Sequence, residues 1–168
     1  NNCTVHHTDQ RLETIETIES FDCVISYGYR YILPPSVLDD FSCPAFNLHI
    51  SYLPYNRGAH PNFWAFYDNT PSGVTIHLIS DGLDTGPIVR QRAVSFRESD
   101  DTFAKTYSVL INNLEDLFLE FLPSLLTDSW VAEPQKGLGT YHNAKDLPIN
   151  FSGWDSNIAD EIGRLRKV

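Results

Sequence analysis

Residues 45–51 read AFNLHIS and residues 73–86 read GVTIHLISDGLDTG. Each stretch opens with alternating apolar and polar side chains, a pattern typical of a β-strand. Asn47 and His49 are two positions apart, so they share one face of the first strand. The second strand runs into a loop rich in Gly and Asp that carries Asp84. The pattern therefore predicts an amide, an imidazole and a carboxylate near strand ends, where open α/β sheets bind ligands.

The neighbouring segments predict alternating helices and strands. We expect a helix over residues 9–20, a short buried strand over 21–26 and a short helix over 34–40. A short helix over 62–67 and a strand over 87–96 flank the second stretch. The order helix, strand, helix, strand implies parallel pairing with right-handed crossovers. The sequence therefore predicts an α/β fold with an open, mostly parallel sheet and flanking helices.

The longest predicted element is an amphipathic helix that Asp100 or Asp101 is expected to cap. Its apolar residues recur every three or four positions, which predicts one face packed against the core. Pro123 predicts a kink in this helix or its end. The apolar stripe consists of Phe103, Tyr107, Leu110, Leu114, Leu117, Phe118 and Phe121.

The chain changes character after residue 126, where polar and turn-forming residues become frequent. We therefore expect a main domain over residues 1–126 and a C-terminal extension over residues 127–168. The extension is expected to contain short strands at 130–131 and 140–142 and a last helix over 157–167, capped by Asp155 or Ser156.

Composition limits the classes of protein to consider. The 168 residues carry a formal net charge of −10, which argues against tRNA or DNA as a partner, because nucleic-acid-binding proteins present basic surfaces. No apolar run approaches the ~20 residues of a membrane helix. Cys3, Cys23 and Cys43 form neither a paired nor a metal-binding motif, so we expect free thiols in the cytoplasm and no metal. The sequence contains no Met, which predicts that its natural beginning is missing.

Asn47, His49 and a nearby carboxylate would together suit acyl transfer to an amine. A neutral His accepts a proton from an attacking amine, and Asn donates a hydrogen bond to a carbonyl oxygen that gains negative charge. A carboxylate beside the His raises its pKa and relays a proton through water. No Ser or Cys lies in a nucleophile-elbow setting, so direct attack by a bound amine fits better than a covalent intermediate. On the residues alone, His49 also fits a structural role in the core, and Asp81 is as good a carboxylate as Asp84.

Longer motifs around these residues carry a family resemblance. Residues 47–54, NLHISYLP, resemble the N-x-H-x-S-x-L-P segment of the folate-dependent formyltransferases. Residues 74–88 resemble the strand and the Asp-x-Gly loop of the same family. The match selects Asp84 over Asp81 as the family's carboxylate.

Within this family, the chain is most similar to the sugar N-formyltransferases. Residues 55–64, YNRGAHPNFW, are similar to their W-N-R-G-x-x-P-N-x-W stretch, with Tyr55 in place of Trp. Residues 68–74 and residues 139–147, GTYHNAKDL, also match their patterns. The resemblance covers roughly residues 22–150.

The resemblance implies a Rossmann-like formyltransferase fold, with a catalytic domain over residues 1–126 that lacks the family's first strand and helix. It implies that N10-formyltetrahydrofolate donates a formyl group to the amine of a nucleotide-linked amino sugar, of the dTDP-4-amino-4,6-dideoxyhexose type, without a metal. Asn47 would hold the formyl oxygen, and His49 would serve as base or stabilise the tetrahedral intermediate. Asp84 would tune His49 and relay the proton.

The resemblance also implies the partners and the binding residues. We expect a cytoplasmic enzyme of lipopolysaccharide O-antigen biosynthesis that forms a homodimer and binds neither nucleic acid nor a membrane. The folate would be bound by Tyr27, Tyr29, Tyr31, Ile32, Leu33, Ile79, Ser80, Asp81, Gly82 and Asp84. The sugar nucleotide would be bound by Tyr55, Arg57, Trp64 and Tyr141.

Three other readings stay open at this point. A purine-pathway enzyme, phosphoribosylglycinamide formyltransferase, would use the same residues on another amine. A folate-binding or assembly module without turnover would bind folate and never transfer formyl. A hydrolase would let water replace the amine and release formate.

Overall fold

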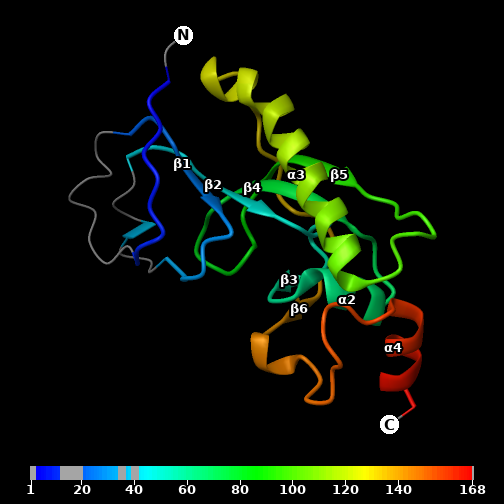
Figure 1. The fold of residues 1–168 in the computed structure, drawn as a ribbon. Helices are drawn as coiled ribbons and strands as arrows, with labels where there is room; N and C mark the ends of the chain where they lie inside the picture. The colour runs from blue at the N-terminus through cyan, green and yellow to red at the C-terminus, as the bar shows by residue number, and fades with distance from the viewer. Residues whose placement is uncertain (1–2, 12–20, 34–36, 39–41, 168) are drawn as a thin grey trace.

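A four-stranded sheet lies at the centre of the computed structural model, which describes residues 3–11, 21–33, 37–38 and 42–167 (Figure 1). β1 and β2 pair in parallel, as the element order predicted, whereas β4 pairs antiparallel with both β2 and β5. The predicted α/β class is confirmed, and the described sheet is mixed. In spatial order its strands are β1 (Val24–Tyr27), β2 (Ala45–His49), β4 (Gly73–Leu78) and β5 (Ile88–Ala93).

The predicted helices before β2 fall largely outside the described residues. Residues 9–11 of the expected helix over 9–20 are described and are not helical. Of the expected helix over 34–40, only Val37 and Leu38 are described, and both are helical.

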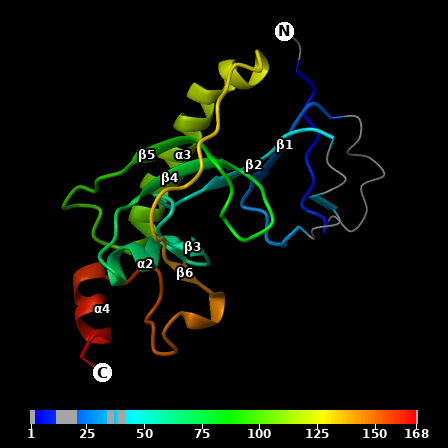
Figure 2. The ribbon, with the colours of Figure 1, turned by 180° about the vertical axis from the view of Figure 1, so that it is seen from behind.

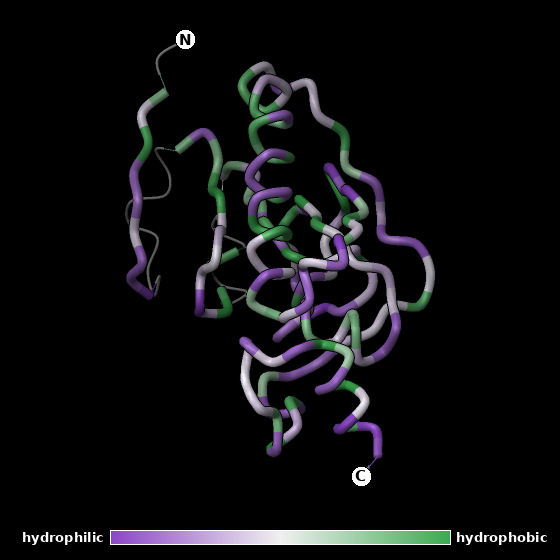
Figure 3. The backbone as a smooth tube through the Cα atoms, turned by 45° about the vertical axis from the view of Figure 1, so that its right-hand side comes forward, coloured by the Kyte–Doolittle hydropathy of each residue, from purple (hydrophilic) through white to green (hydrophobic). Residues whose placement is uncertain are grey.

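The long helix α3 (Phe103–Leu126) packs across one face of the sheet (Figure 1). Hydrophobic and hydrophilic residues alternate along it, as Figure 3 shows. Burying one large apolar side chain contributes about 1.5–3 kcal/mol, so this contact is a major source of stability. In the described part of the chain, no helix has the length and apolar character needed to span a bilayer. The core between α3 and the sheet includes Leu110, Leu114, Leu117 and Phe121 of the helix and Phe46, Leu48, Val74 and Ile76 of the strands.

The ends of α3 differ from the prediction. The cap is Thr102, whose side chain accepts a hydrogen bond from Lys105 N at 3.3 Å, and neither Asp100 nor Asp101 takes this place. Pro123 does not end the helix, which continues to Leu126. Proline inside a helix loses one backbone hydrogen bond and its ring crowds the carbonyl four residues earlier, a cost that α3 absorbs in its last turn.

The C-terminal residues return to the sheet and then form a smaller layer beside it. After α3 the chain runs past the sheet toward β6 (Tyr141–His142), as Figure 2 shows. Trp130 and Val131 are not a strand, contrary to the prediction, and the pairing with the sheet falls on Glu133, whose backbone bridges Ile88 at the start of β5. The predicted short strand at 140–142 is confirmed as β6 (Tyr141–His142), which pairs in parallel with β3 (Arg57–Gly58).

Two short helices complete this layer. α2 (Pro61–Tyr67) and α4 (Ile158–Leu165) share an aromatic and aliphatic core with the beginning of α3. The cap of α4 is Asn157, which accepts from Asp160 N at 3.2 Å, so Asp155 and Ser156 were the wrong candidates. A short 3-10 helix, η2 (Ala144–Asp146), follows β6.

Candidate functional site

Three polar side chains of β2 and β4 lie on the sheet face opposite α3. Phe46 and Leu48 of β2 pack toward α3, so the alternating residues Asn47 and His49 face the other way. In the antiparallel register of β2 and β4, Asn47 is directly opposite His77. His49 and His77 are both buried. The strand pair therefore places an amide between two imidazoles.

Asp84 reaches the same place from the loop that follows β4. Its backbone is left-handed, with φ at 53°, a conformation that Asp tolerates better than most residues. Asn47 Nδ2 donates to its Oδ1 at 3.1 Å, and Gly58 N donates to its Oδ2 at 2.8 Å. Position 58 requires glycine, because a Cβ there would lie 2.3 Å from the carbonyl oxygen of His142. Asp84 is thus bonded to both β2 and β3.

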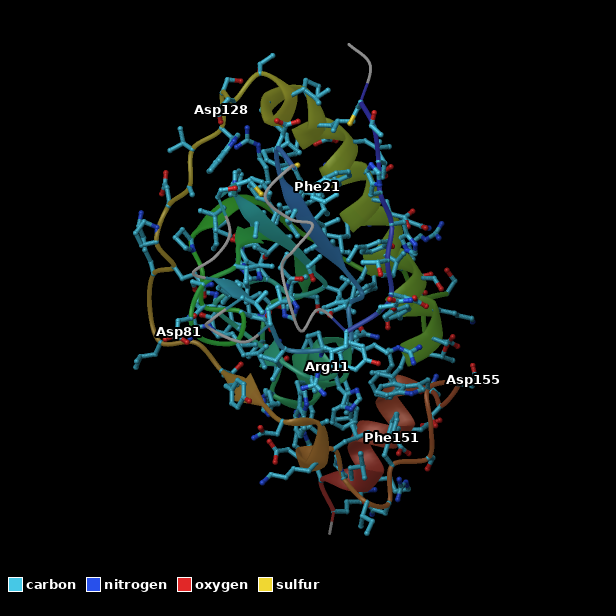
Figure 4. The ribbon with its side chains drawn as sticks, turned by 90° about the vertical axis from the view of Figure 1, so that its left-hand side faces the viewer. Arg11, Phe21, Asp81, Asp128, Phe151 and Asp155 are labelled. Carbon is cyan, nitrogen blue, oxygen red and sulfur yellow. The ribbon has the colours of Figure 1, made fainter. Side chains whose placement is uncertain are left out.

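Asp84 and Asp81 were equal candidates on composition, and the structure separates them. Asp84 is 8% exposed and touches Asn47, whereas Asp81 lies on the exposed part of the loop (Figure 4). Only Asp84 is therefore within reach of the two imidazoles of the strand pair, at 3.6 Å from each.

His77 fixes the orientation of the Asn47 amide. Its Nδ1 is 2.8 Å from the carbonyl oxygen of Leu78, so Nδ1 carries the proton and donates it. Its Nε2 is then an acceptor for Asn47 Nδ2, which lies 3.2 Å away. Both amide hydrogens of Asn47 are therefore engaged, one by His77 and one by Asp84.

The groups around His49 determine which of its two ring nitrogens can accept a proton. Nε2 lies 3.3 Å from the carbonyl oxygen of Asn56 and 3.6 Å from Asp84 Oδ2. Both neighbours are acceptors, so the neutral ring carries its proton on Nε2. The lone pair that can receive a proton is consequently on Nδ1.

Burial and charge set the protonation states of this cluster. Burial is the largest influence on His49 and lowers its pKa, while the charge of Asp84 acts in the opposite direction. Burial alone would raise the pKa of Asp84, but interactions with His77, His49 and Gly58 N outweigh it and bring this pKa to about 2. At neutral pH, Asp84 is therefore ionised and His49 is a neutral base.

A cavity of about 900 Å³ opens over this cluster, a size typical of small-molecule sites. Asn47, His49, His77 and Asp84 all line it. Every residue that the family resemblance assigned to folate also lines it, namely Tyr27, Tyr29, Tyr31, Ile32, Leu33, Ile79, Ser80, Asp81, Gly82 and Asp84.

Of the residues assigned to the sugar nucleotide, the structure places only Tyr141 in the lining of this cavity. Tyr55 lines a different cavity of about 580 Å³. Trp64 is buried, and the ring of His142 stacks on it at 3.9 Å. The guanidinium of Arg57 is bonded to Gln135, with Nη2 at 2.6 Å and Nε at 3.1 Å from Oε1.

Sequence reasoning missed His77 and Gln135. His77 belongs to an alternating strand, and its role appears only once the register with β2 is known. Gln135 lies in the extension, 51 residues from Asp84, where no local pattern singles it out.

Comparison with known proteins gives relatives with assigned reactions. The family model described as formyl transferase matches residues 4–121. A dTDP-4-amino-4,6-dideoxyglucose formyltransferase from Mycobacterium tuberculosis is 34% identical over 132 residues, covering 79% of this chain and 55% of the relative. A methionyl-tRNA formyltransferase from Thermodesulfovibrio yellowstonii is 36% identical over 123 residues, covering 72% of this chain and 39% of the relative. The chain thus spans about half the length or less of these curated relatives.

A solved structure extends the likeness over most of the chain. The formyltransferase PseJ from Anoxybacillus kamchatkensis, in complex with UDP-4,6-dideoxy-4-formamido-L-AltNAc and tetrahydrofolate, is 42% identical and has a TM-score of 0.84. The match covers 94% of this chain and 85% of that one. The predicted Rossmann-like formyltransferase fold is confirmed by this match.

We expect His49 to titrate below its ordinary pKa of 6.5, because burial disfavours the charged ring. The substitution Asp84→Asn removes the charge that favours the protonated ring, so the midpoint should fall further. A pH series of imidazole ¹H–¹⁵N spectra of the two proteins measures both midpoints. A midpoint that rises in the Asp84→Asn variant would contradict the described electrostatics.

His77→Phe should destabilise the fold more than His77→Gln does. Phe leaves one amide hydrogen of Asn47 without its acceptor, and an unsatisfied buried polar group costs about 1–3 kcal/mol. The side-chain oxygen of Gln can replace Nε2 as acceptor. Urea denaturation gives the free energy of unfolding of each variant, and equal losses would show that the Asn47–His77 bond contributes nothing.

Proposed function

The chain belongs to the formyl transferase family, and from this premise we propose that it transfers a formyl group from N10-formyltetrahydrofolate to the amine of a nucleotide-linked amino sugar. The observation that carries the proposal is the cluster of Asn47, His49 and Asp84 in one cavity. The residue types and their protonation states suit acyl transfer to an amine.

The cavity fits a folate on its own chemistry. Aromatic and apolar side chains of residues 27–33 form one part of its wall, and the loop at 79–84 forms another. A pterin needs a flat apolar contact and polar groups along its edge, and these two segments offer both. Bound there, N10-formyltetrahydrofolate would supply the activated formyl carbon.

Asn47 and Asp84 form the part of the site that stabilises charge. The bond from Asn47 to ionised Asp84 is charge-assisted, so it holds the amide in place. The other amide hydrogen meets the neutral Nε2 of His77, a weaker partner. We propose that this second hydrogen is the one that Asn47 gives to the formyl oxygen.

His49 takes the proton of the attacking amine. Its Nδ1 carries the lone pair, and its neutral state at physiological pH follows from burial. Asp84, 3.6 Å from Nε2, stabilises the imidazolium once the proton has been taken. Asp84 is ionised before the reaction, because its pKa is about 2, so its carboxylate can accept the proton from His49 through water and relay it onward.

We propose a 4-amino-4,6-dideoxyhexose as the acceptor sugar. The M. tuberculosis relative is assigned to the dTDP-linked 4-amino-4,6-dideoxyglucose, and PseJ holds a UDP-linked 4-formamido sugar. The similarity to PseJ covers more of both chains, so UDP is the nucleotide to test first and dTDP the second. We keep O-antigen biosynthesis, a cytoplasmic location and a homodimer as parts of the proposal. Free thiols at Cys3, Cys23 and Cys43 agree with the reducing cytoplasm.

The first test is a transfer assay with N10-formyltetrahydrofolate and a panel of acceptors. The panel holds UDP- and dTDP-linked 4-amino-4,6-dideoxyhexoses, glycinamide ribonucleotide, methionyl-tRNA and a sample without acceptor. We expect mass spectrometry to find the formyl group on an amino sugar only. Methionyl-tRNA should stay unmodified, because a protein with a net charge of −10 is repelled by nucleic acid.

Each other outcome would point to a different reading. Transfer to glycinamide ribonucleotide alone would favour the purine-pathway enzyme. Formate released without an acceptor would indicate a hydrolase, and folate binding without any transfer would indicate a binding module.

Substitutions in the cluster should lower turnover while the fold persists. His49→Ala removes the general base, which typically contributes 10²–10⁴-fold, so we expect a loss of kcat of about that size. Asn47→Ala should cost about 10²–10³-fold, as loss of an oxyanion donor does. The exposed His7 supplies a matched control, His7→Ala, and the exposed Asp155 (Figure 4) supplies a second, Asp155→Asn. The kcat of both should equal that of the unsubstituted protein. Near-normal kcat in His49→Ala would refute the assigned base.

A further inference from the structure

The side chain of Gln135 lies between Arg57 and the loop that carries Asp84. Its Nε2 donates to the carbonyl oxygens of Asp84 and Gly86, both at 2.8 Å. Its Oε1 accepts from Arg57 Nη2 at 2.6 Å and from Nε at 3.1 Å. All hydrogen-bonding positions of the amide are therefore used, and every partner is part of β3 or of the catalytic loop.

We propose that Arg57 and Gln135 are positioning residues that hold Asp84 in its catalytic place. This inference rests on the proposed function, and it assigns Arg57 a role other than contact with the sugar nucleotide. The guanidinium is a pure donor, so it turns Oε1 of Gln135 toward itself and Nε2 toward the loop. Neither residue acts on substrate directly.

The loop needs such a hold because its shape is not the one that the chain adopts freely. Asp84 has a positive φ, which costs free energy in a residue other than glycine. The hydrogen bonds from Gln135 satisfy the backbone at Asp84 and Gly86, and those from Asn47 and Gly58 satisfy the carboxylate. Backbone and side chain of Asp84 are thus fixed independently.

The same contacts join Asp84 to the strand that receives its carboxylate. Arg57 and Gly58 are adjacent in β3, so one turns its side chain to Gln135 while the other donates its N–H to Asp84. β3 is itself held by β6, where Arg57 N donates to the carbonyl oxygen of Thr140 at 3.0 Å. Gln135 and Thr140 both belong to the segment 133–142.

This segment lies in the predicted extension, outside the residues that the family model matches. It is anchored before Gln135 by two backbone bonds between Glu133 and Ile88, at 2.7 and 2.8 Å. Gly86, at the end of the loop that carries Asp84, has no room for a side chain, because a Cβ would meet the carbonyl of Leu78. The predicted extension therefore contributes residues to the proposed catalytic centre, although the other residues of that centre lie before the predicted boundary at residue 126.

The test uses side chains that keep size and change hydrogen bonding. Gln135→Met keeps the length and is neutral, but it loses both donors and the acceptor. Arg57→Met loses the donors to Oε1, and Arg57→Lys keeps one. Lys136→Gln is the matched control, since Lys136 is exposed and its partner is the exposed Glu133.

We expect Gln135→Met and Arg57→Met to lower kcat by up to about 100-fold, the loss that a displacement of a reacting group by about 1 Å can cause. KM for folate and acceptor should change less than kcat does, because neither Arg57 nor Gln135 lines the cavity. Arg57→Lys should recover part of the loss, and Lys136→Gln should behave like the unsubstituted protein. The double variant should be no slower than Gln135→Met alone, because both changes break one network.

A second readout separates this inference from the proposed function. If Gln135→Met releases Asp84, the raising influence of its charge on His49 weakens, and the imidazole NMR midpoint of His49 should fall. This measurement needs no substrate, so it decides the inference even if the unsubstituted protein formylates nothing. An unchanged kcat, or an unchanged His49 midpoint, in a folded Gln135→Met protein would overturn the inference. Thermal unfolding of each variant shows that it is folded.

Discussion

The ionised carboxylate of Asp84 is the group on which the arrangement of the site depends. A buried charge is costly unless polar partners surround it, and here Asn47 and the N–H of Gly58 donate to it. The charge also dictates the direction of the other bonds. An amide oxygen would be repelled at 3.1 Å from a carboxylate oxygen, so Asn47 must present Nδ2. Its second hydrogen then requires an acceptor, which His77 supplies because its own proton is on Nδ1.

The two faces of the sheet link this polar cluster to the stability of the fold. Phe46 and Leu48 bury their side chains against α3, and the residues between and after them, Asn47 and His49, face the cavity. A slip of one residue in the register would send the polar residues into the core and the apolar ones into the cavity. The cost of burying unpaired amide and imidazole groups excludes that slip. Core packing and the arrangement of the polar cluster are therefore set by the same strand alignment.

The sequence predicts what depends on local pattern. Alternation located β2 and β4, the helical period located α3, and motif matches named residues that line the cavity. Local pattern does not say which of several oxygens reaches a free N–H, so the caps of α3 and α4 were assigned to the wrong neighbours. Contacts between distant segments were also out of reach. Arg57 is hydrogen-bonded to Gln135, 78 residues further along the chain, and the ring of His142 stacks on Trp64. No motif in the sequence reveals either contact.

The distance along the chain between these partners has a physical consequence for the site. Segments that include β2, β3 and the loop after β4 supply Asn47, Gly58 and Asp84, and each hydrogen bond between them restricts a different part of the loop. The residues that close this arrangement come last, with Gln135 and Thr140 in the segment 133–142. These later contacts add to those within the loop, where Thr85 Oγ1 donates to the carbonyl oxygen of Gly82, and together they offset the cost of the positive φ at Asp84. The proposed reacting groups thus lie within the matched family segment, whereas Gln135 and Thr140, which bond to the Asp84 loop and to β3, lie beyond it.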